Sequence, residues 1–484
     1  MTVTDIDRHL FVIFGGTGDL ARRKLIPSLH RLIIEEGLAE RCVILCVAPD
    51  DFDDDTYRAW TRRALADAGI AEVELDAWRD DNVFYQHIGA DAQSYMDLRR
   101  RIEAIESDRD LPGNRAWYLA LPPSVFPIAI THIGGAGLNR GPGWTRLVIE
   151  KPFGTDLETA RELNAVVHRH FEESQVYRID HYLGKETVQN LLALRFANPM
   201  FETIWNRDRI ESVEITVAED LGIGTRAGYY ESAGALRDMV QNHLTQVLAL
   251  VAMEPPISFD ADQIRNEKVK VVSAIAPIQR ENVVFGQYEA GTIDDVAVPG
   301  YRDEEGVAPG STTPTFVGIK LEVDTWRWRG VPFYLRTGKR LPKRLTQIAV
   351  TYQRPPLCIF HGRRDTCTVS PDVLVITLQP DESFALHFNV KAPGGSYTLE
   401  SQALRFSHGD VYGRLPDAYQ TLILDVLEGD QTLFVRSDEV EASWRLYDPL
   451  LDLTPEPHRY VAGTWGPADL DQGLALGEGV WMSR

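Results

Sequence analysis

Short apolar runs alternate with helical patterns over roughly the first 180 residues. Runs of this kind lie at 10–14, 42–47, 116–121 and 146–149, and they are typical of strands buried on both faces of a parallel sheet. Between them, apolar residues recur at helical spacing, which predicts helices at 56–67, at 156–171 and from Ser124 onward. Strands and helices in alternation predict a parallel sheet with helices on both faces.

The pattern changes after residue 200. Residues 211–219 alternate apolar and polar positions and end at Glu219, as in a strand with one buried face. A long helix is expected at 234–252, where Asp238 and His243 interrupt the apolar side. Five residues correspond to about 500° of helical rotation, so these two side chains should share one broad face and could converge on one ligand.

Closely spaced strands dominate the remaining sequence. We expect strands at 315–324, 331–336, 346–353, 372–379 and 384–391, and helices near 416–428 and 438–451. Strands that follow one another with little helix between them favour a mainly antiparallel sheet. The chain is therefore predicted to contain a Rossmann-type domain over residues 1–178 and a larger α+β domain over residues 179–484.

The composition limits which partners the protein can bind and where in the cell it is expected. The 484 residues carry a formal net charge of −21, which argues against nucleic acid and against an anionic membrane surface as partners. The N-terminus has acids where a signal peptide has bases, and no apolar run approaches a membrane span. Cys42 and Cys46 share one predicted strand, about 13 Å apart, too far for a disulfide. We expect free thiols, a cytoplasmic location and no metal site.

A glycine turn directly follows the first apolar run. Its residues are Gly15, Gly16, Thr17, Gly18, Asp19 and Leu20. A strand, a glycine turn and a helix in succession form the pyrophosphate site of dinucleotide-binding proteins, because backbone and the helix N-terminus can approach the phosphates. The spacing G-x-x-G departs from the common G-x-G-x-x-G, and a plain turn is the alternative.

The second apolar run ends in A-P-D-D, where a Rossmann fold reads the adenosine ribose. An acid there, such as Asp50, favours a free 2′-hydroxyl, whereas a basic residue favours a 2′-phosphate. Acids at 50–55 could instead cap the helix predicted at 56–67.

Three polar stretches offer ligand chemistry. Residues 178–186 read R-I-D-H-Y-L-G-K-E and combine His181 and Lys185, suited to a phosphate, with Tyr182 as a neutral donor. The alternative is a solvated loop that opens a helix at 186–197. Lys151 follows a predicted strand in E-K-P-F-G, at the strand end where doubly wound sheets bind ligands. Residues 336–344 form a basic loop, either a solvated turn or a phosphate pocket.

These stretches together resemble the glucose-6-phosphate dehydrogenase family. The matching motifs are G-G-T-G-D-L-A at 15–21, E-K-P-F-G at 150–154, R-I-D-H-Y-L-G-K-E at 178–186, W-N-R-D at 205–208, A-G-Y-Y-E-S-A-G-A-L-R-D-M-V-Q-N-H at 227–243, R-T-G-K at 336–339 and L-P-D-A-Y at 415–419. They occur in the family's order and cover nearly the whole chain.

The resemblance implies a reaction and a catalytic pair. His243 would take the proton from the C1 hydroxyl of glucose 6-phosphate while hydride leaves C1 for NADP or NAD, giving 6-phosphogluconolactone in the first step of the oxidative pentose phosphate pathway. Asp180 would orient the imidazole and stabilise its charged form.

The resemblance also implies the binding residues and the assembly. His181, Tyr182 and Lys185 would hold the phosphate, and Glu219 and Asp238 the sugar hydroxyls. Further contacts would come from Lys151, placed between substrate and nicotinamide, from Lys339, and from Lys343 or Arg344. The family also implies a homodimer or homotetramer formed through the large sheet.

One position departs from the family's pattern. NADP-using members carry an arginine where this chain has Pro49, followed here by Asp50. A lost charged hydrogen bond is worth roughly 1.5–3 kcal/mol, so we expect NAD to be used as well as NADP or better. Arg22, Arg23 or Lys24 could supply the missing charge.

Two other functions are compatible with parts of the sequence. E-K-P after a Rossmann strand also resembles the glucose–fructose oxidoreductase group, which acts on unphosphorylated sugars, but the set of His181, Tyr182 and Lys185 favours a phosphorylated sugar. A nucleotide-binding sensor or scaffold would bind cofactor without turnover, and the pair of Asp180 and His243 argues against it.

Overall fold

The chain divides into two compact units. The computed structural model describes residues 6–71, 80–360, 369–394, 398–413, 415–453, 456–474 and 481–482. The first unit comprises Met1–Gly184, Ser258–Arg265 and Pro416–Glu441, and the second comprises Lys185–Ile257, Asn266–Leu415 and Ala442–Arg484. A single boundary after residue 178 therefore leaves out two later segments that pack with the first unit.

The first unit is built on a parallel sheet. Its strand order is β17-β6-β5-β4-β1-β2-β3. The strands are β1 (His9–Phe14), β2 (Cys42–Ala48), β3 (Val83–His87), β4 (Arg115–Leu119), β5 (Thr145–Ile149), β6 (Val176–Ile179) and β17 (Phe434–Val435). All neighbours pair in parallel except β17, which returns from late in the chain to pair antiparallel with β6. Every residue of β1, β2 and β4 is buried, which accounts for their continuous apolar runs.

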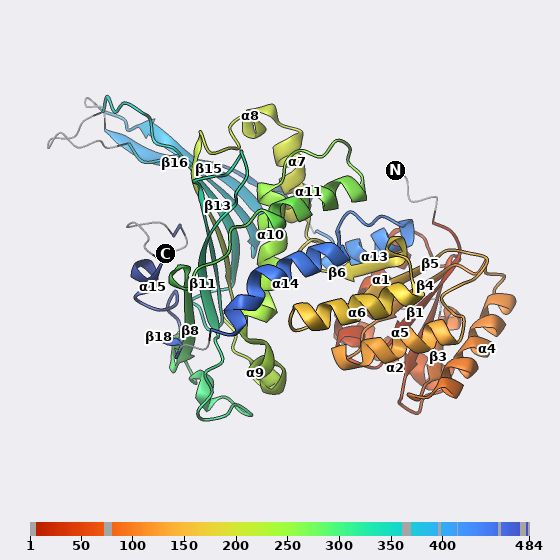
Figure 1. Ribbon diagram of the computed structural model, residues 1–484. Helices are drawn as coiled ribbons and strands as arrows, with labels where there is room; N and C mark the ends of the chain where they lie inside the picture. The colour runs from red at the N-terminus through yellow and green to blue at the C-terminus, as the bar shows by residue number, and fades with distance from the viewer. Residues whose placement is uncertain are drawn as a thin grey trace. The chain divides into compact units, whose positions relative to one another are not determined.

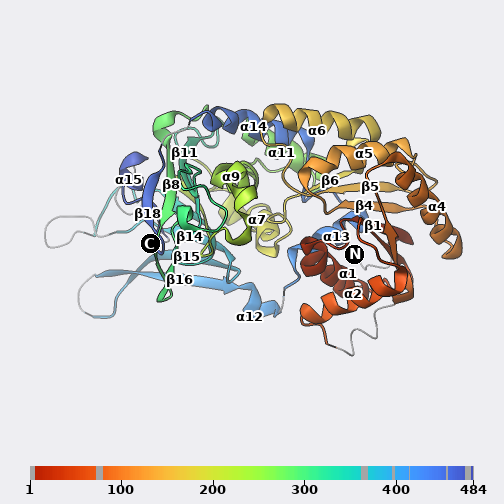
Figure 2. The ribbon, with the colours of Figure 1, turned by 90° about the horizontal axis from the view of Figure 1, so that it is seen from below.

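Helices cover both faces of this sheet (Figure 2). One group is α1 (Ile26–Glu35), α2 (Asp54–Asp67) and α13 (Ala418–Glu428), in which α1 contacts the other two. The other group is α4 (Ala92–Asp108), α5 (Phe126–Gly135) and α6 (Leu157–His170), in which α5 contacts both neighbours. Asp53 and Asp156 form capping boxes that start α2 and α6. The predicted Rossmann-type domain is confirmed.

The second unit is built on a larger, mainly antiparallel sheet, as predicted. Its strand order is β16-β15-β14-β13-β7-β12-β11-β8-β18. The strands are β7 (Ile210–Ala218), β8 (Val283–Glu289), β11 (Phe316–Glu322), β12 (Pro332–Gly338), β13 (Leu345–Tyr352), β14 (Val373–Gln379), β15 (Ser383–Lys391), β16 (Leu399–Ser407) and β18 (His458–Val461), with a separate hairpin of β9 (Gly291–Ile293) and β10 (Val296–Val298). Only the β7–β12 and β8–β18 pairs of this sheet are parallel. Figure 1 shows β15 and β16 as a long pair at one edge.

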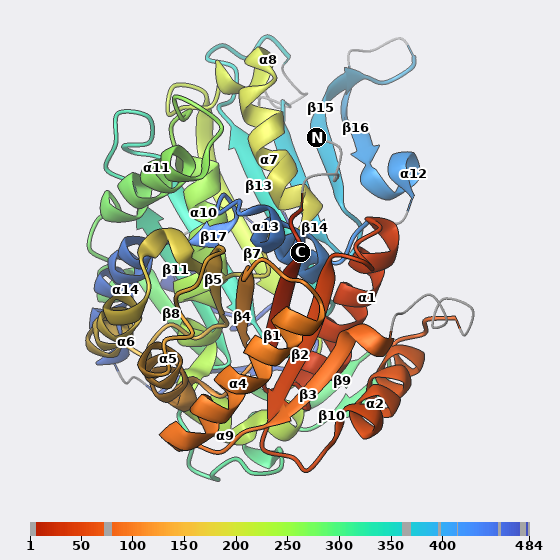
Figure 3. The ribbon, with the colours of Figure 1, turned by 90° about the vertical axis from the view of Figure 1, so that its right-hand side faces the viewer.

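The helices of the second unit are α7 (Glu186–Phe196), α8 (Pro199–Glu202), α9 (Ala227–Ala235), α10 (Thr245–Ala252), α12 (His408–Tyr412) and α15 (Leu470–Gly473). Helices α11 (Ala261–Ser273) and α14 (Ser437–Leu451) carry residues of both units. In Figure 3, α7 lies along the sheet near β14, and the two elements are in contact. No helix among the described residues is long and apolar enough to span a membrane.

The helix expected at 234–252 is confirmed over residues 236–252, where the π-helix η6 (Leu236–Leu244) continues directly into α10. It starts two residues late, because Gly234 adopts a φ of 58° and separates it from the preceding helical turn of α9. One prediction about local structure is wrong in part. The expectation of free thiols holds for Cys42 and Cys46, which are free and buried. It fails for Cys358, which is disulfide-bonded.

Candidate functional site

In the glycine turn after β1, close packing leaves no room for side chains at two of the glycines. Gly15 has a φ of 80°, and a Cβ there would lie 2.2 Å from the Ala120 carbonyl oxygen. A Cβ at Gly16 would lie 2.6 Å from Cys46 Cβ. Gly18 is exposed, and a Cβ there would meet only the Gly15 carbonyl oxygen, at 3.2 Å. The turn therefore needs two glycines for its own packing, and its backbone at Gly18 stays open to a ligand.

Thr17 connects this turn to the end of β2. Its hydroxyl donates to Asp50 Oδ2 at 2.5 Å, which places the exposed Asp50 carboxylate beside the turn. Asp19 and Leu20 follow, and the π-helix η1 (Ala21–Leu25) continues into α1. An open glycine backbone, a helix start and a carboxylate at the second strand fit a pyrophosphate and a ribose hydroxyl. The residues present therefore fit a nicotinamide dinucleotide.

A buried acid and a half-buried lysine follow β5. Lys151 is half-buried and is joined to Pro152 by a cis peptide bond. The preceding residue, Glu150, is buried, and its Oε1 accepts a hydrogen bond from the Tyr118 hydroxyl at 2.6 Å. Burial raises the pKa of Glu150, although Tyr118, Lys151 and Tyr419 act in the opposite direction.

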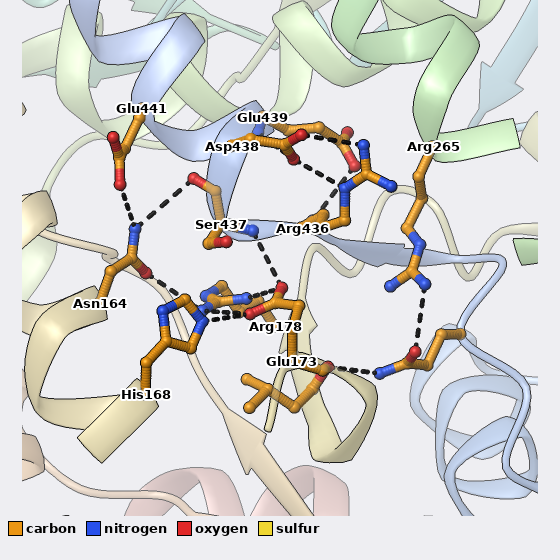
Figure 4. Close-up of polar contacts among 12 residues, drawn as sticks. Asn164, His168, Glu173, Arg178, Arg265, Arg436, Ser437, Asp438, Glu439 and Glu441 are labelled. Atoms are coloured by element: carbon orange, nitrogen blue, oxygen red, sulfur yellow. Dashed lines mark hydrogen bonds and ion pairs between the residues drawn. The ribbon is translucent and has the colours of Figure 1, made fainter. Parts of the chain in front are cut away.

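An ion pair anchors β6, the strand in which the polar stretch 178–186 begins (Figure 4). Arg178 of β6 is 1% exposed and contacts Glu173 through two hydrogen bonds, at 2.6 and 3.2 Å. The backbone N–H of Ser437 donates to the same carboxylate at 3.0 Å, and Arg178 also donates to Asn164 Oδ1 at 3.0 Å. Burial favours a higher pKa for Glu173, but Arg178, His168 and Ser437 outweigh it and lower the pKa.

Asp180, His181 and Tyr182 leave the end of β6 together. Asp180 is buried, and its Oδ1 accepts from the Tyr182 backbone N–H at 3.0 Å. The half-buried His181 ring lies 5.1 Å from the buried Tyr182 ring and 6.3 Å from the Tyr419 ring, measured between centroids. The alternative of a fully solvated loop does not hold for these residues, because Asp180 and Tyr182 are buried.

The second unit begins at Lys185, the residue before α7. Its side chain is buried, at 8% exposure. The first turn of α7 is fixed by Thr187, whose backbone N–H and hydroxyl both donate to Glu382 Oε2, at 3.1 and 2.7 Å. Burying an ammonium group is costly unless an anion pairs with it, and the N-terminus of a helix also attracts negative charge. This position is therefore suited to binding an anion.

Lys339, Glu219 and Asp238 form an ionic cluster in the second unit, in which Lys339 and Asp238 are buried and Glu219 is half-buried. The Lys339 ammonium lies 2.6 Å from Glu219 Oε2 and 3.8 Å from Asp238 Oδ2. It also lies 5.2 Å from the centre of the Tyr230 ring, and the Tyr229 hydroxyl donates to Asp238 Oδ1 at 3.3 Å. Burial, and then the Asp238 carboxylate, raise the pKa of Tyr229, so its hydroxyl stays a donor.

His243 lies on the same π-helix as Asp238. It is 1% exposed, and its backbone N–H donates to Asn242 Oδ1 at 2.6 Å. The register of the helix is held by Thr245, whose hydroxyl donates to the Val240 carbonyl oxygen at 2.7 Å and is also hydrogen-bonded to the Tyr447 hydroxyl at 3.0 Å. A π-helix hydrogen-bonds from i to i+5 and is frequent at functional sites, and it spans both polar residues that interrupt the apolar side.

The structure groups the predicted residues within each unit. The cofactor residues and Lys151, Asp180, His181 and Tyr182 belong to the first unit, and Lys185, Glu219, Asp238, His243, Lys339 and Arg344 to the second. Among the described residues, no hydrogen bond or ion pair joins the exposed Arg344 to the ionic cluster. The pairing of Asp180 with His243 stays a prediction.

Sequence reasoning gave no role to three aromatic residues. Tyr229 and Tyr230 contact the ionic cluster, and Tyr419 contacts His181. The only signal for them was their presence in motifs shared with the family.

Comparison with known proteins covers both units. Residues 12–190 match the family described as glucose-6-phosphate dehydrogenase, NAD binding domain, and residues 192–482 match its C-terminal domain. A glucose-6-phosphate 1-dehydrogenase of Aggregatibacter actinomycetemcomitans is 43% identical over 97% of this chain and 96% of the relative. The one of Bacillus subtilis (strain 168) is 41% identical over 96% of both chains.

Solved structures agree with the sequence matches. A structure described as glucose-6-phosphate dehydrogenase in complex with its substrate glucose-6-phosphate superposes with a TM-score of 0.90, at 35% identity and 98% coverage of both chains. A glucose-6-phosphate 1-dehydrogenase from Mycobacterium avium gives a TM-score of 0.83, at 35% identity and 97% coverage of both chains. The chain belongs to the glucose-6-phosphate dehydrogenase family.

Proposed function

We propose that this chain oxidises C1 of glucose 6-phosphate to 6-phosphogluconolactone, with a nicotinamide dinucleotide as hydride acceptor. Membership of the family supports the reaction, and a relative at 35% identity is described in complex with that sugar phosphate. The reaction is the first step of the oxidative pentose phosphate pathway.

The observation that carries the proposal is the ionic cluster of Lys339, Glu219 and Asp238, in which Lys339 and Asp238 are buried. Buried charges persist in proteins when they are paired and hydrogen-bonded, and this cluster combines two carboxylates, an ammonium and the Tyr229 hydroxyl. Such groups can donate hydrogen bonds to the hydroxyls of a sugar and accept hydrogen bonds from them. His243, five residues after Asp238 on the same π-helix, is the proposed base.

Proton removal is assigned to the histidine. We assign His243 to accept the C1 hydroxyl proton and Asp180 to orient the imidazole and stabilise its charged form. The nicotinamide, when bound, supplies the hydride acceptor. Lys151, at the end of β5, is placed between the sugar and the cofactor, at the strand end where such sheets bind ligands.

The phosphate is assigned to His181, Tyr182 and Lys185. The two cationic or proton-donating side chains neutralise the charge of the phosphate, and the Tyr182 hydroxyl adds a neutral donor. This set separates the proposal from a dehydrogenase of unphosphorylated sugars. Arg344 or Lys343 remains a proposed outer contact, since both are exposed on the turn before β13.

We further propose that NAD serves as well as NADP or better. Asp50 at the end of β2 accepts from Thr17 and suits a ribose hydroxyl. Three cations could supply the positive charge that is missing at Pro49, but each is already in an ion pair. Arg22 pairs with Asp67, Arg23 with Asp19 and Lys24 with Asp417. A 2′-phosphate would meet a carboxylate and no unpaired cation among these three residues.

A test of the reaction follows reduced-nicotinamide absorbance with purified protein. Glucose 6-phosphate and glucose are compared as substrates, each with NAD and with NADP. Turnover of glucose 6-phosphate with either cofactor supports the reaction. Turnover of glucose but not of glucose 6-phosphate would indicate a dehydrogenase of unphosphorylated sugars. Cofactor binding without turnover of either sugar would favour a nucleotide-binding sensor.

The cofactor preference has its own test. Pro49→Arg should raise kcat/KM with NADP roughly tenfold or more, because one charged hydrogen bond is worth about 1.5–3 kcal/mol, and should leave the value with NAD nearly unchanged. A wild-type kcat/KM for NADP far above that for NAD would contradict the proposal.

The assembly and the location remain predictions. A homodimer or homotetramer through the large sheet is supported by its outer strand, β16, which is mostly exposed. The cytoplasmic location rests on the sequence alone.

A further inference from the structure

Helix α7 begins at a residue that cannot cap it. Its N-cap is Lys185, whose backbone is extended and whose side chain makes no cap hydrogen bond. The first N–H groups of an α-helix have no partner inside the helix, and a side-chain oxygen at the N-cap usually accepts from one of them. A lysine side chain has only donors. This helix start therefore needs an acceptor from another part of the chain.

Glu382 supplies that acceptor from the turn between β14 and β15. Its Oε2 accepts from the Thr187 backbone N–H at 3.1 Å and from the Thr187 hydroxyl at 2.7 Å. Thr187 is the second residue of α7 and is fully buried, so both donors are shielded from water. A carboxylate at a helix N-terminus is also favoured by the helix dipole. Glu382 thus takes the place of an N-cap side chain, although it lies 195 residues further along the chain.

The turn that carries Glu382 is tied to α7 at a second point. The Glu382 carbonyl oxygen accepts from the His408 backbone N–H at 3.0 Å, which joins the turn to the first residue of α12. The His408 ring is 2% exposed, and its Nε2 lies 2.5 Å from Asn190 Nδ2. Asn190 follows Thr187 by about one helical turn, so both lie on one face of α7. Two contacts on this face fix the first turns of the helix.

The position of Lys185 depends on this helix start. Its carbonyl oxygen accepts from the backbone N–H groups of Val188 and Gln189, at 3.0 and 3.2 Å, so its backbone moves with the first turn of α7. Its side chain is buried, which leaves the ammonium little freedom to compensate for a shift of the backbone. Binding groups need to be held within about 0.5 Å of their productive geometry. The geometry of Lys185 therefore depends on the cap.

We infer that Glu382 is a positioning residue for phosphate recognition: its carboxylate caps α7 from outside and so fixes the helix start that places Lys185. The inference rests on the proposed function, in which Lys185 contacts the phosphate. Glu382 acts through Thr187 and α7, and it has no assigned contact with the sugar, the proton or the hydride.

The charge of Glu382 acts against its positioning role, and the two effects can be separated. A carboxylate near an anion-binding lysine repels the anion, whereas the cap needs only an acceptor oxygen. The charge is felt at the start of α7, because burial, and then the Glu382 carboxylate, raise the pKa of Glu186. A glutamine at position 382 keeps an acceptor oxygen and removes the charge, whereas an alanine removes both.

The experiment compares Glu382→Ala and Glu382→Gln with a matched control, Asp381→Ala. Asp381 is the exposed neighbouring acid in the same turn, so its replacement removes a charge but not the cap. We expect Glu382→Ala to raise KM for glucose 6-phosphate roughly three- to tenfold, as for one lost hydrogen bond, with kcat changed less than about twofold. Glu382→Gln should keep KM close to the wild-type value, and Asp381→Ala should leave KM unchanged.

Further readouts separate positioning from a general loss of structure. Thr187→Val removes the hydroxyl but keeps the backbone N–H, so it should raise KM less than Glu382→Ala does. In a Lys185→Ala background, Glu382→Ala should not raise KM further, because both changes act through the same ammonium. The dissociation constant of inorganic phosphate, measured by calorimetry, should rise in Glu382→Ala by the same factor as KM. The dissociation constant of NAD should not change, since the cofactor residues belong to the first unit.

The outcomes distinguish this inference from the proposed function. An unchanged KM and phosphate affinity in Glu382→Ala would overturn the inference. Equal losses in Glu382→Ala and Glu382→Gln would also overturn it, because they would assign the effect to the charge. So would a further rise in KM when Glu382→Ala is added to Lys185→Ala. Wild-type turnover of glucose 6-phosphate tests the proposed function on its own, and Lys185→Ala provides the reference, since it should weaken phosphate binding at least as much as Glu382→Ala.

Discussion

At the scale of single residues, the proposed chemistry depends most on His243. His243→Asn keeps a polar side chain of similar reach but removes the group that accepts the proton. We expect kcat to fall about 10²–10⁴-fold, the usual contribution of a general base, while the dissociation constant for glucose 6-phosphate changes little. Steady-state kinetics and calorimetric binding measure the two effects, and a near-normal kcat would remove His243 from the proposed mechanism.

A second residue, His9, should make stability depend on pH. It is fully buried at the start of β1, and its Nδ1 is hydrogen-bonded to the Asp7 carbonyl oxygen at 2.8 Å. Burial lowers its pKa to about 4. In the unfolded chain a histidine titrates near 6.5, so between pH 6.5 and 4 the unfolded state binds more protons and stability falls as pH falls.

The expected loss is about 3 kcal/mol over this window, from roughly 2.5 pKa units at 1.36 kcal/mol each. Urea unfolding at pH 7 and pH 4 measures it. His9→Asn keeps a donor for the Asp7 carbonyl oxygen and removes the titration, so it should flatten this part of the pH dependence. An equally steep fall in the variant would assign the effect to other groups.

At the scale of elements, Gly184 determines how closely α13 packs on the polar stretch. A Cβ there would lie 2.6 Å from the Ala418 carbonyl oxygen and 2.8 Å from Leu422 Cγ. Gly184→Ala should therefore cost about 1–3 kcal/mol of stability, as overpacking does. Gly135→Ala is the matched control at the end of α5, where a Cβ meets nothing within 4 Å.

The control should have the opposite sign. Alanine restricts the unfolded chain more than glycine does, so Gly135→Ala should raise stability by about 0.4–1 kcal/mol. Thermal unfolding of both variants checks the pair. A Gly184→Ala variant as stable as Gly135→Ala would mean that α13 can move away from the polar stretch at little cost.

Much of the element order could be predicted from the sequence, and the exceptions have physical causes. β1, β2 and β5 match the predicted runs within one residue at each end, because strands buried on both faces leave continuous apolar runs. β16 was missed because most of its residues are exposed, so burial imposes little pattern on it. β17 was missed because a strand of two residues is too short to show an alternating pattern of apolar and polar positions. Its pairing with β6 nevertheless joins residues 416–441 to the first unit.

The site was predictable only in part for a related reason. Its charged members stand out in sequence, and the structure joins Glu219, Asp238 and Lys339 in one ionic cluster, while their roles toward the sugar stay predictions. Tyr419 and His181 are far apart in sequence, and aromatic residues are common in cores, so no spacing marks their contact. The break at Gly234 was also hidden, because a glycine in a helical pattern does not reveal its φ.

At the scale of the whole molecule, the outer edge of the large sheet is the strongest candidate for self-association. β16 is a nine-residue edge strand, and unpaired edges of that length are usually covered or blocked. Its Leu404 is 65% exposed and its Phe406 38%, and in α12 just beyond, Val411 and Tyr412 are 58% and 69% exposed. Adjacent exposed apolar residues of this kind mark interaction surfaces.

A charge on this edge should weaken the assembly. With a net charge of −21 on each chain, two copies repel one another, so association must draw on apolar burial, and Leu404→Glu removes part of it while adding charge. We expect wild-type protein to have the mass of a dimer or tetramer by light scattering, and Leu404→Glu to dissociate at higher concentration. Ile128→Glu, at a 46% exposed position on α5, is the control and should associate normally. A monomeric wild type would contradict the predicted assembly. Equal dissociation of both variants would place the contact elsewhere, because only the edge variant alters the strand that would face the partner.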